Sequence, residues 1–160
     1  QWTNVYPGRY VVDVSSGGNG ESYMKSATLG TSPAEAGFSI TGPSSIDVVL
    51  RPNAGILEGV VLEHDQPSGN AQVVAVPEEK YRKVNQRFGF GTTDQNGHFV
   101  MRGLAPGIYT LFAWQDVDDE LYYDAGFLKT QESNGVSLRV EEGSRQKIEL
   151  KVSEVGEEWQ

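Results

Sequence analysis

The sequence contains no cysteine, and this absence removes several kinds of chemistry at once. No disulfide can stabilise the fold, no thiolate can act as a nucleophile, and no zinc site can use sulfur ligands. Histidine is scarce too: only His64 and His98 occur, and neither has a second histidine at metal-ligand spacing. The Gly-x-Ser-x-Gly motif of many serine hydrolases is also missing. These absences favour a protein that is not an enzyme, with no catalytic residues and no cofactor.

Basic residues are few. Thirteen Lys and Arg stand against 22 Asp and Glu, which gives a formal net charge of −9. Such an acidic balance disfavours nucleic acid and anionic membrane surfaces, because both attract clustered positive charge. No apolar run approaches the roughly 18 residues of a bilayer-spanning helix. We therefore expect no nucleic-acid partner and no membrane insertion, whereas cations and neutral sugars stay compatible with the charge.

Helical patterns are scarce, and strand patterns dominate. Only residues 33–36 and 78–84 offer a turn or two of helix. The 19 glycines and 7 prolines favour many short strands joined by turns. Asn96-Gly97 predicts a hairpin turn, because both residues tolerate a positive φ, and Asp94 is expected to bond the backbone of that turn. Strands are expected at 56–63, 71–76, 86–93, 98–102, 108–115, 136–140 and 147–152.

The first part of the chain resembles the last part at an offset of roughly 98–100 residues, as in an internal repeat. Four segments match in the same order: 6–12 with 105–111, 23–29 with 122–128, 38–40 with 136–138, and 46–50 with 146–150. Residues 54–153 are therefore predicted to form a complete β-sandwich, residues 1–53 a partial copy that holds the C-terminal half of the strand pattern, and residues 154–160 a tail.

The partial copy needs completion, because three or four strands do not readily close a two-sheet core alone. Three explanations stay open for residues 1–53. They dock on the complete domain, they pair with another chain, or they are the remainder of a divided domain.

Two further motifs carry a family resemblance. Residues 93–99 match the pattern Thr-Asp-x-x-Gly-x-Phe, and residues 104–109 match Leu-x-Pro-Gly-x-Tyr. With Gly59-Val60-Val61 as an opening strand, residues 55–152 resemble the carboxypeptidase regulatory-like family, which is prealbumin-like and related to Cna-B domains. Asn70 stands where that family usually has glycine. The resemblance implies an all-β, antiparallel, Ig-like or prealbumin-like β-sandwich.

The resemblance also implies a role. Such domains occur in tandem as non-catalytic structural or interaction modules of secreted or cell-envelope bacterial proteins. The expected partners are protein neighbours in a larger extracellular chain or assembly at the cell surface, and assembly through strand pairing is one route. The prealbumin-like fold includes hydroxyisourate hydrolase, but the closing Tyr-Arg-Gly-Ser motif of that enzyme is missing here. The lysine and the acid of an isopeptide crosslink are missing from residues 56–62 and 109–114 as well.

Two groups of residues remain as candidate sites. The aromatic side chains of Trp114, Tyr122, Tyr123 and Phe127 surround an acidic loop, and exposed rings beside carboxylates form a platform for sugar rings. Carbohydrate binding is therefore the alternative function, although core packing explains the same aromatics. The acidic run itself is a candidate calcium site, because Ca²⁺ takes several carboxylate oxygens from loops; its residues are Asp116, Asp118, Asp119 and Glu120.

Overall fold

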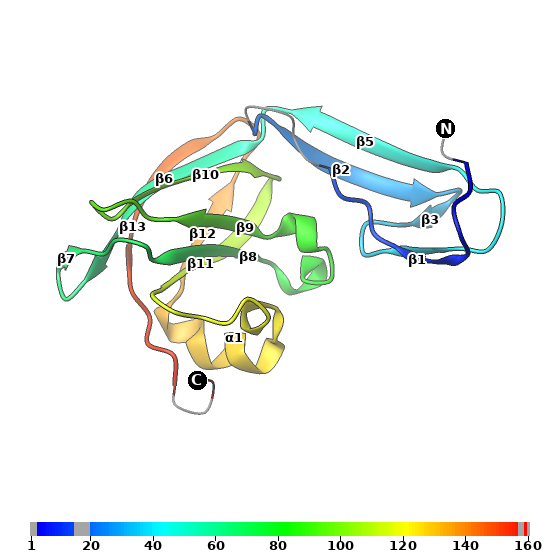
Figure 1. Cartoon of the computed structure of the whole chain (residues 1–160). Coiled ribbons are helices and arrows are strands. Elements are labelled where there is room, and N and C mark those ends of the chain that lie inside the picture. Colours follow the sequence, from blue (N-terminus) through cyan, green and yellow to red (C-terminus); the bar gives the residue numbers. More distant parts are fainter. Residues whose placement is uncertain (1–2, 15–19, 157–158, 160) are drawn as a thin grey trace.

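Strands account for most of the regular structure in the computed structural model, which describes residues 3–14, 20–156 and 159 (Figure 1). The N-terminal unit contains β1 (Gly8–Tyr10), β2 (Ser22–Leu29), β3 (Ser32–Pro33), β4 (Phe38–Ile40) and β5 (Ile46–Pro52). The larger unit contains β6 (Gly55–Glu63), β7 (Gln66–Pro67), β8 (Gln72–Pro77), β9 (Gly89–Thr92), β10 (His98–Leu104), β11 (Gly107–Trp114), β12 (Val136–Val140) and β13 (Arg145–Lys151). The expected all-β sandwich is confirmed.

The larger unit is built from two facing sheets. One sheet has the order β10-β6-β13, with β7 paired to β6, and the other has the order β12-β11-β8-β9. One pair departs from the antiparallel pattern: β13 runs parallel to β6, with Arg145 opposite Ile56 and Lys151 opposite Leu62. A parallel neighbour needs a long crossover connection. Here the chain between β6 and β13 supplies it by crossing to the other sheet and back.

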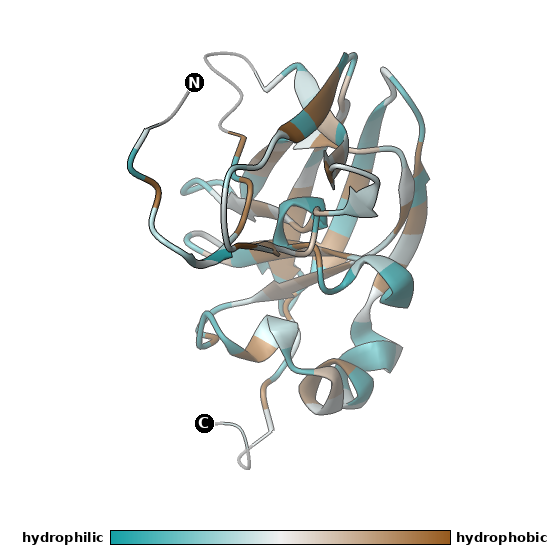
Figure 2. Ribbon diagram, turned by 90° about the vertical axis from the view of Figure 1, so that its right-hand side faces the viewer, coloured by the Kyte–Doolittle hydropathy of each residue, from teal (hydrophilic) through white to brown (hydrophobic). Residues whose placement is uncertain are grey.

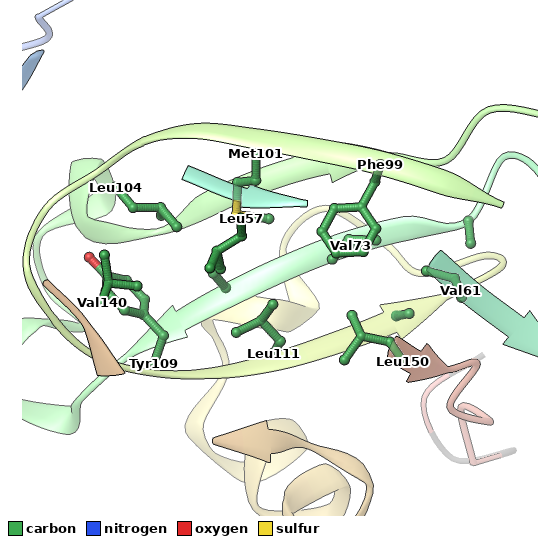
Figure 3. Close-up of a cluster of buried hydrophobic side chains, with 13 residues drawn as sticks. Leu57, Val61, Val73, Phe99, Met101, Leu104, Tyr109, Leu111, Val140 and Leu150 are labelled. Atoms are coloured by element: carbon green, nitrogen blue, oxygen red, sulfur yellow. The ribbon is translucent and has the colours of Figure 1, made fainter. Parts of the chain in front are cut away.

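The main core lies between these two sheets. On β11, Tyr109, Leu111 and Ala113 alternate toward the interior, as the period-2 pattern of this strand predicts. Figure 3 shows their neighbours from five further strands converging on the same space. Leu57 and Leu111 are both 0% exposed, so the core is closed to solvent. Burial of such side chains stabilises a fold by about 1.5–3 kcal/mol each.

The second face of β8 and β11 is buried too, and apolar residues accordingly follow one another almost without interruption along both strands. Short helical segments cover that face: η3 (Leu121–Tyr123), α1 (Ala125–Gln131) and η4 (Glu132–Asn134). Side chains of β8, β11 and these segments, with Phe88 before β9, form what we call the outer cluster: Val74, Val76, Phe88, Phe112, Trp114, Val117, Tyr122, Phe127 and Leu128. The larger unit therefore has three layers, two sheets and a helical cover (Figure 1).

Helix α1 was not expected from the sequence, which predicts no helix in residues 121–131. Asp124 caps its N-terminus, since the Asp124 Oδ1 atom accepts a hydrogen bond from the Phe127 amide at 2.8 Å. Phe127, Leu128 and Gln131 form its buried face. The residues predicted as short helices fare differently: residues 33–36 form none, and 78–84 contain the 3₁₀ turn η1 (Glu79–Tyr81), followed by η2 (Asn85–Arg87).

The N-terminal unit has its own two small sheets, β1-β4 and β3-β2-β5. A small core lies between them, with Met24, Ala27 and Ala34 buried, and Val84 of the larger unit completes it. Figure 2 views the molecule from the side of this unit and shows hydrophobic and hydrophilic residues interleaved along its strands. The unit is thus completed partly by the larger unit.

One of the four repeat matches is wrong. Residues 23–29 belong to the strand β2, whereas their proposed counterparts in 122–128 are helical, with η3 and α1. The hairpin β2–β3 instead resembles the hairpin β6–β7 in its backbone hydrogen bonds. Ala34 donates its amide to the Ala27 carbonyl at 2.8 Å, and Ser68 donates to the Val61 carbonyl at 2.9 Å in the same way. The first unit therefore contains an opening hairpin, not only the second half of the strand pattern.

The two units meet without a flexible connection. Strand β5 passes into β6 through Asn53-Ala54, where the Ala54 amide donates to the Glu21 carbonyl at 2.9 Å and the Asn53 carbonyl accepts from the Gly143 amide at 2.6 Å. On the other side of the junction, the Gln86 Nε2 atom donates to the Val12 carbonyl at 2.8 Å and lies 3.0 Å from the Asp13 carboxylate. Contacts on two sides hold residues 3–14 and 20–53 against the larger unit.

A tyrosine hydrogen bond recurs in both units. The Tyr109 hydroxyl donates to the Ala105 carbonyl at 2.8 Å, and the Tyr10 hydroxyl donates to the Tyr6 carbonyl at 2.7 Å, each across four residues. These positions are the ones that the first repeat match aligns. They differ in burial. Tyr109 is 2% exposed and its hydrogen bond is buried, whereas Tyr10 is half-buried and its hydrogen bond to Tyr6, which is 80% exposed, is open to solvent. Burial also raises the pKa of Tyr109 to about 12.

This difference predicts unequal losses of stability. We expect Tyr109→Phe to lower the free energy of unfolding by roughly 1–3 kcal/mol, because it leaves a buried carbonyl without its donor. The matched variant Tyr10→Phe removes the same bond at an exposed position, and we expect a loss below about 0.5 kcal/mol. Urea titration followed by circular dichroism measures both. Equal losses in the two variants would contradict the role assigned to burial.

The predicted tail is partly packed. The Ser153 amide, directly before the tail, donates to the Ala113 carbonyl at 2.7 Å. Within the tail, the ring of Trp159 contacts that of Phe127, with centroids 5.6 Å apart. Residues 157–158 and 160 of the predicted tail lie outside the described residues. Among the residues that the structure describes, no helix has the length and apolar character needed to cross a bilayer.

Candidate functional site

Two of the four predicted ligand-binding aromatics belong to the core. Trp114, at the end of β11, and Phe127, on α1, are both 0% exposed. Their ring centroids are 5.6 Å apart, and Trp114 stacks on Phe112 at 5.1 Å. The Trp114 Nε1 atom donates to the buried Gln131 Oε1 at 3.2 Å. The prediction of a ligand role for Trp114 and Phe127 is corrected here, because neither ring presents a face to solvent.

The other two predicted aromatics lie at the edge of the outer cluster. Tyr122 is 8% exposed and Tyr123 is 40% exposed, and their centroids are 4.8 Å apart. The structure adds two rings from β9 and its start: Phe90 lies 5.2 Å from Tyr122, and Phe88 lies 4.8 Å from Tyr123. Phe90 is 47% exposed, so two partly exposed rings, Phe90 and Tyr123, border a buried aromatic series.

Phe88 and Phe90 were not among the candidate residues predicted from the sequence, although their spacing carries a signal. Residues 86–93 were predicted as a strand, and positions two apart on a strand point to the same face. Phe88-Gly89-Phe90 therefore predicted two rings on one face, which is how they lie, stacked at 6.4 Å. What the pattern could not show is that η3, more than 30 positions later, brings Tyr122 and Tyr123 to them.

An open depression of about 310 Å³ lies beside these rings. It is lined by residues 72–74 of β8, by residues 90–92 of the edge strand β9, and by Asp119 and Tyr122. The Gln72 Oε1 atom is buried and makes no hydrogen bond within the described residues. The depression thus combines an apolar ring, a carboxylate and an unpaired amide oxygen.

The acidic side chain changes the electrostatics of the site. Burial raises the pKa of Tyr122 to about 12, and the negative charge of Asp119 raises it further. The pKa of Tyr123 is raised for the same two reasons, burial first and Asp119 second. Both hydroxyls therefore stay protonated at neutral pH. They are hydrogen-bond donors beside a carboxylate acceptor, which suits a hydroxyl-rich neutral ligand.

The predicted calcium residues do not converge. Asp116, Asp118, Asp119 and Glu120 are all exposed, and the Asp118 Oδ1 atom accepts from the Glu120 amide at 3.1 Å in a local turn. No three Asp, Glu or His side chains come together at metal-binding distances in the part of the chain that the structure describes. Calcium binding at this loop stays a prediction without a converging ligand set.

The loop at residues 94–97 forms a turn, as its sequence predicts, but this turn does not close a hairpin: β9 pairs with β8, β10 pairs with β6, and the two strands lie in different sheets. Gly97 has a positive φ of 74°, whereas Asn96 does not. The Asp94 carboxylate accepts from the Asn96 amide at 2.8 Å and from the His98 amide at 2.9 Å. The hydrogen bond from His98 is the main reason why the pKa of Asp94 lies below its ordinary value. The other histidine, His64, lies in the β6–β7 turn with a φ of 49°. His64 therefore belongs to a turn, and His98 begins the strand β10 directly after one.

Comparison with solved structures finds distant similarities. No protein-family model matches the chain, and no curated protein matches it. One similar solved structure is described as the Bacillus anthracis TIE protein, with 18% identity, a TM-score of 0.39, and coverage of 72% of this chain and 20% of that one. Another is the crystal structure of (S)-allantoin synthase, with 13% identity, a TM-score of 0.36, and coverage of 62% and 40%. This chain thus spans less than half of either protein, and neither likeness bears on its function.

Proposed function

We propose that this chain is a non-catalytic structural or interaction module of a secreted or cell-envelope bacterial protein. The observation that carries the proposal is the junction between the two units. A spacer must hold its neighbours at a fixed distance and angle, and units joined through a flexible linker do not. Here Val84 of the larger unit is buried in the core of the N-terminal unit, and Gln86 is hydrogen-bonded to Val12.

Small-angle X-ray scattering tests the spacer role. We expect the wild-type profile to fit one fixed arrangement of the units, because contacts on two sides of the junction oppose rotation. Val84→Ser combined with Gln86→Ala removes one side, and we expect a larger radius of gyration. Gln95→Ala, in an exposed turn, is the matched control and should leave the profile unchanged. A wild-type profile that needs many orientations would reject the proposal. Immunodetection in medium and envelope fractions tests the compartment separately.

Carbohydrate binding is the second candidate, and the partly exposed rings of Phe90 and Tyr123 favour it. Apolar faces of sugars stack on such rings, while carboxylates such as Asp119 accept hydrogen bonds from hydroxyls. The site proposed here differs from the one expected from the sequence, because Trp114 and Phe127 are replaced by Phe90.

A glycan array followed by affinity electrophoresis tests this candidate. If the site binds a glycan, we expect Phe90→Ala and Tyr123→Ala each to weaken retention by about tenfold, in line with 1–2 kcal/mol for one lost ring contact. Tyr6→Ala removes a ring that is 80% exposed on the N-terminal unit and is the matched control. Retention that survives both site variants, or that the control abolishes, would rule out this site.

A further inference from the structure

Strand β5 is the outermost strand of its sheet, and its free edge lies along the rim of the molecule (Figure 1). Among residues 3–14, 20–156 and 159 it pairs with β2 alone, so its other side presents backbone N–H and C=O groups without a strand partner there. Natural proteins protect such edges with charges, with prolines inside the strand or with very short strands. β5 has seven residues, and its centre, Val48-Val49-Leu50, is uncharged and apolar. The usual protection is absent from this centre.

Both faces of β5 are exposed. Val48 lies opposite Ala27 and Leu50 opposite Met24, so both point to the face of the small core. Ala27 is 0% exposed, whereas Val48 is 37% and Leu50 is 47% exposed. Ile46, on the same face of β5, packs against the small core. Further along the strand, Val48 and Leu50 stay partly exposed among the described residues, although they face the same way.

Two other edge strands differ. The edge strand β13 carries Arg145, Lys147, Glu149 and Lys151, and its net positive charge opposes pairing with a copy of itself. The edge strand β12 has five residues and a buried end at Val140. Strand β5 alone among these three combines length, exposure on both faces and an apolar centre.

The sequence of β5 is complementary to itself in the antiparallel direction. A two-fold axis through Val49 places Asp47 opposite the partner's Arg51, and Arg51 opposite the partner's Asp47. The same register places Val48 opposite the partner's Leu50. Asp47 and Arg51 form no ion pair within the described residues. Opposite charges directly across an antiparallel pair stabilise it, and like charges destabilise it. The charges lie on the outer face, while the apolar pairs extend the face of the small core.

We propose that β5 is a homodimerisation strand, which pairs antiparallel with β5 of a second copy in the register centred on Val49. The inference rests on the interaction role proposed above and names the partner of the module. It joins two three-stranded sheets into one six-stranded sheet through strand addition. A two-fold contact of this kind uses the same surface on both copies, so it closes as a dimer and does not propagate.

Charge reversal tests the register by analytical ultracentrifugation. In a dimer of Asp47→Arg, an arginine at position 47 faces Arg51 of the other copy at both ends of the contact. In a dimer of Arg51→Asp, two aspartates face each other at both ends in the same way. We expect each variant alone to dimerise at least about tenfold more weakly than the wild type. Mixed in equal amounts, the two variants have opposite charges at both positions, so a heterodimer should form. The double variant Asp47→Arg/Arg51→Asp should regain the homodimer. Both substitutions are at exposed positions, and circular dichroism confirms folding.

A single cysteine gives a second test, because the chain has no cysteine of its own. The axis through residue 49 brings the two Cα atoms to about 4.5–5.5 Å, within the range of about 4.4–6.8 Å for a disulfide. We expect Val49→Cys to oxidise to a covalent dimer. Val100→Cys is the matched control, at a valine on β10 that is 49% exposed, and should crosslink far more slowly.

Two results would overturn the proposal. One is a wild-type chain that stays monomeric at the highest concentration reached, with Val49→Cys no faster to crosslink than Val100→Cys. The other is a dimer that both single charge reversals leave unchanged. In either case, scattering by the monomer still tests the spacer role, because the variants that perturb the junction, Val84→Ser and Gln86→Ala, lie outside β5.

Discussion

Replacing Trp114 by alanine will lower the free energy of unfolding by about 3–5 kcal/mol, the range for a fully buried large aromatic side chain. The ring is 0% exposed and lies between Phe112, at 5.1 Å, and Phe127, at 5.6 Å. Its removal leaves a cavity between the sheet and α1. It also leaves the buried Gln131 Oε1 atom without its donor.

Chemical denaturation measures this loss, and Trp114→Phe separates its causes. Phenylalanine keeps an aromatic ring between the same neighbours but cannot donate to Gln131, so we expect a loss of about 1–3 kcal/mol. A loss below about 1 kcal/mol for Trp114→Ala would contradict the packing of α1 on the sheet. The result also bears on function, because a lectin-type platform at Trp114 would tolerate alanine without unfolding.

Gly97→Ala is expected to cost far more than Gly30→Ala, although both glycines have a positive φ. The φ angles are 74° and 61°, so both variants incur the cost of the left-handed conformation, about 1–2 kcal/mol. A Cβ atom at Gly30 would meet no atom within 4 Å. A Cβ atom at Gly97 would lie 2.7 Å from the Val61 carbonyl oxygen and 3.0 Å from the Ser68 amide nitrogen. Both are backbone atoms, so the turn itself must move.

We expect Gly30→Ala to lower the free energy of unfolding by about 1–2 kcal/mol and Gly97→Ala by roughly 2–5 kcal/mol, since overpacking adds about 1–3 kcal/mol to the backbone strain. The movement would also lengthen the 2.8 Å hydrogen bond from the Val61 amide to the Gly97 carbonyl. Thermal and urea unfolding of the two variants provide the comparison. Equal losses in the two variants would show that the close contact of the Gly97 turn with β6 and β7 adds nothing to the cost of the substitution.

Strand positions and turns were predictable because their signals are local. The alternation in β12 and β13, the Asn96-Gly97 turn and the bonding of Asp94 to its own backbone each depend on residues within a few positions of one another. The face of β11 that bears Tyr109 was predictable for the same reason.

The burial of individual aromatic side chains was not predictable, because an aromatic residue on a strand gives the same local sequence pattern whether or not another segment covers that face of the sheet. Trp114 and Phe90 both occupy strands, yet one is 0% and the other 47% exposed. The difference arises because α1 covers the end of β11 and nothing among the described residues covers Phe90 fully. Asp124, which caps α1, is a residue type common at helix N-termini, so the start of this helix had a local signal. The apparent repeat of residues 23–29 at 122–128 favoured the same structure for both segments instead.

The sequence by itself determined that this chain alternates strands and turns, because period-2 hydrophobicity and turn residues act over a few positions. Only the tertiary structure decided which strands became neighbours: β13 parallel to β6, η3 against β9, and β5 left at an open edge. These choices depend on contacts between segments far apart in the chain, which compete with one another for the same apolar surfaces. The candidate sites depend on the same packing, because each consists of side chains or backbone groups that remain exposed after the segments have packed.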